Sequence, residues 1–212
     1  MTDNRPDFSK YLAHFTTGRR PVSNDVENPT GAITRSKNAY QRLISILKEK
    51  KIYASNLPWT GRQAVCFTEC PWSSLIGHSK VYSPYGIGFS KPFIFGTGGG
   101  PAYYVRKDHW DKQEWGEHIK TFVTPFWPSY RTKKQKENIK FGTVDYSHER
   151  EWRVPHDLLF DYDHIEFIVV KNYEDMAKFP QELKNAIGRD KFIIMEIYTN
   201  IEKLWPVHNL GQ

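Results

Sequence analysis

Two glutamates stand two residues apart in the segment SHEREWRVP. Successive side chains of an extended strand point to opposite faces, so the spacing predicts that Glu149, Glu151 and Arg153 share one face. Trp152 and Val154 then share the other, apolar face. A carboxylate held on a rigid strand can stabilise a developing cation or accept a hydrogen bond from a hydroxyl group. The segment therefore predicts a catalytic carboxylate at the start of a strand.

The same acids have two other interpretations. Glutamates at strand ends are often solvated or paired with a nearby arginine, here Arg150 or Arg153. Alternatively, Asp145 joins Glu149 and Glu151 as ligands of a divalent ion in a phosphate-directed hydrolase, although this set of carboxylates is incomplete. The residues alone leave these alternatives open.

Other candidate ligand-binding residues lie on two further segments. His14 and Thr16 belong to YLAHFT, where the histidine either contacts a ligand or is satisfied in the core. Tyr82 and Tyr85 precede GIGFS, whose glycines let a ligand approach the backbone, and Ser90 ends that segment. The tyrosines also suit ordinary packing at a strand edge.

Neither a metal site nor a phosphate loop is expected. Cys66, Cys70 and His78 would form an incomplete zinc set. The glycine-rich Gly96–Pro101, GTGGGP, matches no phosphate-loop motif and is expected to be a flexible connection between strands.

The elements that must position these residues are mostly strands. Strands are expected at 11–16, 52–55, 64–68, 85–90, 102–106, 164–171 and 191–198, and helices at about 35–50 and 173–187. Helices intervene irregularly between these strands, which favours a single α+β domain, residues 1–212, with a split or twisted sheet around a central cleft and flanking helices.

Composition sets the broad class. Lys and Arg number 30 against 24 Asp and Glu, a net charge of +6, which permits a nucleic-acid partner without requiring one. No apolar run is long enough to span a membrane, and the N-terminal segment lacks the apolar core of a signal peptide. With two cysteines and no disulfide framework, a cytoplasmic protein with reduced thiols is expected.

The segment EREWRVP resembles the third signature of the ADP-ribosyltransferase fold, in which Glu-x-Glu opens a strand that runs to a proline. The resemblance implies that Glu151 bonds a ribose hydroxyl of NAD and supports an oxocarbenium-like transition state as nicotinamide leaves. Glu149 would assist the acceptor nucleophile. On the same resemblance His14 would hold the adenosine ribose, with Thr16 as its neighbour, and Arg153 would pair with a carboxylate or the pyrophosphate.

A broader resemblance covers about residues 11 to 155. HFT, VCFTE, YGIGFSK, PAYYV and EREWR follow one another as in the AbiGi-type abortive phage-resistance family, and loosely as in the DarT-type DNA-modifying transferases. The chain departs from the Ser-Thr-Ser second motif of many transferases. The nearest candidates for that motif are Tyr82, Tyr85 and Ser90, or Tyr103 and Tyr104 of AYYV, and Tyr82 and Tyr85 are the expected lining of the nicotinamide pocket.

The sequence as a whole predicts an NAD-dependent ADP-ribosyltransferase that acts as a toxin or effector in phage defence. Its acceptor would be RNA, DNA or protein, and a cognate antitoxin or toxin protein is an expected partner. The alternative is a non-catalytic antitoxin or binding module that keeps the transferase fold, with its aromatic residues marking an interface.

Overall fold

The computed structural model describes residues 9–17, 37–69, 76–77, 79, 83–127 and 145–204. In chain order the strands are β1 (Tyr11–Phe15), β2 (Lys51–Ile52), β3 (Ser55–Asn56), β4 (Gln63–Thr68), β5 (Gly86–Ser90), β6 (Gly100–Pro101), β7 (Tyr103–Arg106), β8 (Val123–Phe126), β9 (Glu151–Val154), β10 (Leu158–Leu159), β11 (Ile165–Val170) and β12 (Phe192–Ile194). The α-helices are α2 (Ala39–Glu49), α4 (Lys91–Gly96), α5 (Lys107–Trp110), α7 (Tyr173–Lys178), α8 (Gln181–Ile187) and α9 (Met195–Leu204).

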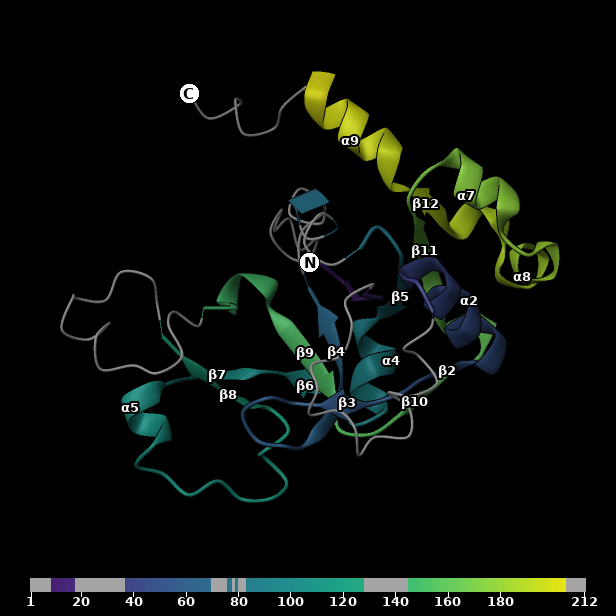
Figure 1. Ribbon diagram of the computed structural model, residues 1–212. Helices are drawn as coiled ribbons and strands as arrows, with labels where there is room; N and C mark the ends of the chain where they lie inside the picture. The colour runs from purple at the N-terminus through teal and green to yellow at the C-terminus, as the bar shows by residue number, and fades with distance from the viewer. Residues whose placement is uncertain are drawn as a thin grey trace, which may run out of the picture.

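An eight-stranded mixed sheet organises the described chain. Its order is β12-β11-β5-β1-β4-β9-β6, with β3 paired to β4 (Figure 1). Only β11 and β12 pair in parallel within this sheet, and α7 and α8 connect them. The expected α+β class is confirmed at this level. The strands that carry His14, Thr68 and Glu151 are three consecutive neighbours in the sheet.

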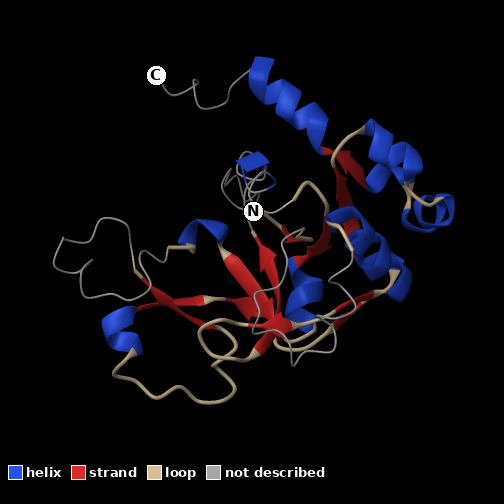
Figure 2. Cartoon of the chain, viewed as in Figure 1, coloured by secondary structure: helices blue, strands red, loops and turns tan. Residues whose placement is uncertain are grey.

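The larger hydrophobic core lies between the sheet and the helices α2, α4, α7 and α8 (Figure 2). Leu12 and Phe89 from the sheet and Leu43 and Leu47 from α2 are fully buried there. A smaller cluster, which includes Phe167, forms separately. Burial of these side chains supplies most of the driving force for folding, at about 25 cal/mol per Å² of apolar surface.

Helix α2 begins at a capping box, in which Asn38 and Gln41 each accept a hydrogen bond from the other's backbone N–H. Its apolar residues recur at the spacing that buries Leu43 and Leu47 on one face. Lys50, in the left-handed conformation, ends the helix. The expected helix is thus confirmed over its described part.

Three expected elements differ from the structure. The expected strand 52–55 is not one strand, because β2 ends at Ile52 and β3 begins at Ser55. The segment 191–198 is a strand only over Phe192–Ile194, because pairing with β11 ends at Val170 and α9 begins at Met195. The expected helix 173–187 is two helices, since the residue before a proline disfavours helical backbone and Phe179 is extended ahead of Pro180.

The glycine-rich segment contains regular structure that its composition concealed. Its first residue ends α4, and Gly100 pairs with Arg153 at one edge of the sheet as part of β6. A side chain at Gly99 would collide with Ile94 and Val154, so glycine allows this connection to pack closely against the core.

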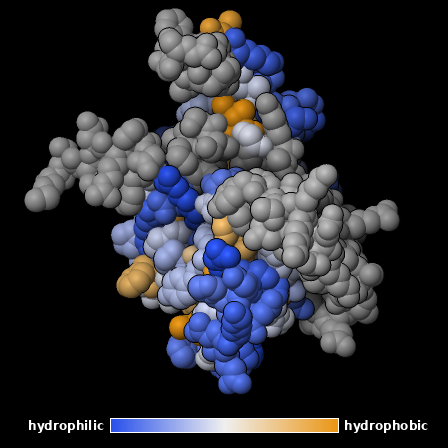
Figure 3. All heavy atoms as spheres, turned by 90° about the vertical axis from the view of Figure 1, so that its left-hand side faces the viewer, coloured by the Kyte–Doolittle hydropathy of each residue, from blue (hydrophilic) through white to orange (hydrophobic). Residues whose placement is uncertain are grey.

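Strands β7 and β8 pair in parallel and, with α5, extend to one side of the main sheet (Figure 1). Figure 3 looks at the molecule from this side and shows mainly hydrophilic residues among its described atoms. No helix in the described ranges is long and apolar enough to cross a membrane.

Candidate functional site on the two sides of strand β4

Strand β4 separates the two groups of predicted site residues. Ala13 of β1 pairs with Thr68 of β4, and Thr68 pairs with Glu151 of β9. Residues directly opposite one another in a sheet point to the same face, whereas the next residue along each strand points away. The side chains of His14 and Glu151 therefore start from opposite faces, two strands apart.

The His14 side chain bonds to β4 beside the last recorded backbone pair of β1 with β4. The backbone pairing of these strands is recorded at Ala13 and Thr68, and at the next position the Nδ1 atom of His14 lies 2.9 Å from the carbonyl oxygen of Cys66. A carbonyl only accepts, so the ring proton resides on Nδ1 and leaves Nε2 as an acceptor. Burial lowers the pKa of His14, which keeps the imidazole neutral near pH 7.

Acidification is expected to destabilise the protein through His14. Below the ordinary pKa of 6.5 the imidazole of His14 is protonated in the unfolded chain, whereas in the folded chain it becomes protonated only at a lower pH. The free energy of unfolding therefore falls as pH drops from about 7 to about 5, and His14→Gln removes part of that slope. Urea unfolding of both proteins across this range measures the difference. Identical slopes would contradict a neutral, buried imidazole.

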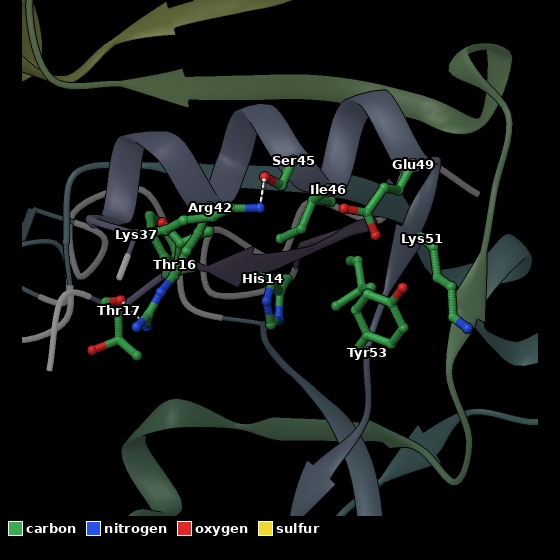
Figure 4. A pocket seen from close by; sticks show the side chains of 12 residues that line it. His14, Thr16, Thr17, Lys37, Arg42, Ser45, Ile46, Glu49, Lys51 and Tyr53 are labelled. Carbon is green, nitrogen blue, oxygen red and sulfur yellow. Dashed lines mark hydrogen bonds between the residues drawn. The ribbon is translucent and has the colours of Figure 1, made fainter. Parts of the chain in front are cut away.

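A cavity of about 200 Å³ lies beside the C-terminal end of β1 (Figure 4). Its lining comes from β1 and the two residues after it, from Lys37 before α2, from the face of α2 that does not enter the core, and from the segment after α2. The residues are His14, Phe15, Thr16, Thr17, Lys37, Arg42, Ser45, Ile46, Glu49, Lys51, Ile52 and Tyr53. Thr16 is buried, and its hydroxyl donates to the Ala39 carbonyl oxygen over 2.8 Å. Thr17 and Lys37, the described residues next to segment 18–36, both line this cavity.

Two cations line this cavity, Arg42 toward the N-terminal end of α2 and the Lys37 ammonium beside Ser45 near the middle of the helix. The Lys37 ammonium donates to the Ser45 hydroxyl over 2.6 Å, a neutral partner that leaves its charge uncompensated in that bond. The Arg42 guanidinium donates to the Thr17 carbonyl oxygen, and burial lowers its pKa. The guanidinium still stays charged at neutral pH, so this end of the cavity is cationic.

On the other side of β4, Glu151 forms a bidentate ion pair with Arg153. The Nε–Oε1 and Nη2–Oε2 distances are 3.0 and 2.8 Å. Arg153 is only 3% exposed and also donates to the carbonyl oxygens of Thr121 and Val123. Burial alone would lower the pKa of Arg153, but its bonds to Glu151 outweigh this and raise it.

Cys66 and Tyr104 complete the surroundings of Glu151. The thiol of Cys66 shares a face with Arg153, and burial, reinforced by Glu151, raises its pKa well above the ordinary value. The Glu151 backbone N–H donates to the Tyr104 hydroxyl over 3.2 Å. Burial raises the pKa of Tyr104 to about 12, so both groups stay protonated at neutral pH.

Glu149 does not share the strand with Glu151, contrary to the alternation read from the sequence. It ends a 3-10 turn, Ser147–Glu149, and Arg150 adopts a left-handed φ of 45° before β9 begins. The Glu149 carbonyl oxygen accepts a bond of 2.6 Å from the Thr68 hydroxyl, which holds this turn against β4. The same-face prediction is confirmed for Glu151 and Arg153.

The remaining predicted residues lie elsewhere. The Tyr85 hydroxyl donates to Asp175 over 2.6 Å, and burial followed by this bond raises the Tyr85 pKa. Ser90 caps α4 by accepting from the Phe93 backbone N–H. Neither lines the cavity beside His14. Tyr82 lies outside the described residues.

Sequence reasoning missed the contribution of α2 to the cavity. Arg42, Ser45, Ile46 and Glu49 are spaced three, four and seven residues apart, which places them on one helix face distinct from the buried one. That spacing was visible in the sequence, but a mixed polar face normally indicates solvent exposure.

The expected absence of a metal site involves partly undescribed residues. Cys70 and His78 lie outside the described ranges, and among the residues within them no group of three or more His, Cys, Asp or Glu could hold an ion.

Comparisons with protein families, curated proteins and solved structures find no match for this chain.

Proposed function

We propose that this chain is an NAD-dependent ADP-ribosyltransferase. The observation that carries the proposal is the place where the backbone pairing of β1 with β4 stops. Ala13 pairs with Thr68, which pairs with Glu151, and the side chain of the next residue, His14, bonds to the Cys66 carbonyl oxygen of β4. Adjacent strands lie about 4.8 Å apart, so His14 and Glu151 stand on strands about 10 Å apart. The two side chains start from opposite faces of the sheet, so the proposal requires a dinucleotide that reaches from one face to the other at the place where the pairing of β1 with β4 stops.

The side chains support the chemistry that such a substrate requires. The bond between C1′ and the nicotinamide nitrogen breaks with its electron pair on nicotinamide, and the carboxylate of Glu151 stabilises the ribosyl cation. Arg153 holds that carboxylate in place, while each oxygen keeps a lone pair for a ribose hydroxyl. The acceptor atom bonds to C1′, and its proton passes to Glu149. A role in phage defence follows from the resemblance described above.

A non-catalytic binding module is the second candidate. The observation that favours it is the completed ion pair between Glu151 and Arg153, which gives the strand-end carboxylate a structural partner. In that case the two residues stabilise the edge of the sheet and contact no substrate.

Titration with NAD separates the two candidates. A transferase is expected to show a rise in Tm as NAD increases, because a ligand that binds the native state stabilises it. It also releases nicotinamide and transfers label from NAD to RNA, DNA or protein in a mixture of the three. If millimolar NAD produces no Tm shift and no release of nicotinamide, the transferase is rejected and the binding module is favoured.

A further inference from the structure

The cavity beside His14 has two chemically different ends. Figure 4 shows Thr16 and Thr17 toward one end, the bond of the Lys37 ammonium to Ser45 near the middle, and Glu49, Lys51 and Tyr53 toward the other end. Arg42 and Glu49 are seven residues apart on α2, a separation of about 10 Å along the helix axis. A ligand lying along α2 therefore meets a cationic end first and a carboxylate last.

The cationic end suits a phosphate group. Arg42 supplies charge and the Thr17 hydroxyl supplies a donor at this end, and the Lys37 ammonium and the Ser45 hydroxyl lie farther along the cavity toward the middle of α2. This end also lies at the N-terminus of α2, where the helix dipole favours an anion. Arg42 presents the planar fork of donors that matches phosphate oxygens.

The opposite end suits a base that carries an amino group. The Tyr53 hydroxyl hydrogen-bonds to Glu49, which raises the Tyr53 pKa and leaves further acceptor positions on the carboxylate. Tyr53 is 36% exposed, so its ring offers a stacking surface. The Lys51 ammonium lies 4.4 Å from the centre of that ring and pairs with Asp157, which offsets its charge.

We propose that this cavity binds the adenylate half of a dinucleotide, with Glu49 as the residue that selects adenine. Phosphate lies at Arg42, a ribose hydroxyl donates to Nε2 of His14, and the exocyclic amine of adenine donates to Glu49. A volume of about 200 Å³ is below the 300–1,000 Å³ typical of complete ligand pockets, which suits half of NAD. The assignment rests on the proposed transferase function and specifies the donor end of its substrate.

Calorimetric titration with AMP and IMP tests the assignment, because IMP carries a carbonyl oxygen in place of the amine. Wild-type protein is expected to bind AMP about ten-fold or more tightly than IMP, since a carbonyl facing a carboxylate loses one charge-assisted hydrogen bond. Glu49→Gln abolishes the preference, because an amide both donates and accepts. Glu182→Gln, an exposed carboxylate on α8, is the matched control and keeps the preference.

Three outcomes overturn the assignment: equal affinity of wild-type protein for AMP and IMP, no binding of AMP at millimolar concentration, or pyrophosphate that competes as strongly as AMP. Release of nicotinamide from NAD is measured separately on the same proteins. Cleavage of NAD without discrimination between AMP and IMP rejects this site alone. Discrimination without cleavage rejects the transferase and leaves a nucleotide-binding cavity.

Discussion

Glu151→Gln is expected to slow nicotinamide release from NAD by about 10²–10³-fold, because removing one preorganised electrostatic partner of the transition state costs about 2.7–4 kcal/mol. The amide keeps the size of the side chain but loses the charge that stabilises the ribosyl cation. Glu166→Gln provides the matched control, since Glu166 is an exposed carboxylate on another strand of the same sheet. It is expected to leave the rate unchanged.

Folding must be measured beside activity in this experiment, because the amide at position 151 compensates Arg153 poorly. Circular dichroism and Tm establish a temperature at which the variant remains folded, and rates are compared there. Glu151→Asp adds a second test, since it keeps the charge but withdraws it by one methylene group. A folded Glu151→Gln protein with wild-type nicotinamide release would reject Glu151 as the catalytic carboxylate.

Arg153→Met is expected to lower the free energy of unfolding by about 3–5 kcal/mol, because breaking a buried ion pair leaves an uncompensated charge. The exposed fractions of the Arg153 and Glu151 side chains are 4% and 14%, so solvent replaces the lost partner poorly. For a chain of this length the loss corresponds to a fall in Tm of about 6–20 °C. Chemical denaturation and calorimetry measure both quantities.

A double variant distinguishes the charge effect from lost packing. Arg153→Met combined with Glu151→Leu removes both charges, and it is expected to recover much of the lost stability. Lys50→Met breaks the exposed Lys50–Asp161 pair and serves as the control with a much smaller effect. A double variant no more stable than Arg153→Met would show that the arginine acts through its bonds to the two backbone carbonyls.

Local patterns predicted the elements near the site more reliably than their arrangement. The alternation in EWRV placed Glu151 and Arg153 on one face and Val154 on the other, apolar face, as the structure has it. The same alternation failed at Glu149, because this residue lies in a 3-10 turn and the left-handed Arg150 separates it from β9. A left-handed residue is hard to predict from sequence unless it is glycine or asparagine.

The order of strands could not be read from the sequence. Strand β4 lies between β1 and β9 through contacts separated by more than fifty residues, and only tertiary packing sets such neighbours. Position 191–198 failed for a related reason, since Ile193 and Ile197 suit strand and helix alike until the length of β11 limits the pairing. The cavity could not be predicted either, because it lies between β1 and a face of α2 whose polar residues suggested solvent exposure.

Cys66 contributes different atoms to each side of the sheet. Its carbonyl oxygen contacts the imidazole of His14, while its thiol belongs to the surroundings of Glu151. A tilt of this one peptide group would therefore move an atom that contacts His14 together with the residue whose thiol faces Glu151. Thermodynamic reciprocity then requires that whatever favours one arrangement on the imidazole side favours its counterpart on the carboxylate side to an equal degree.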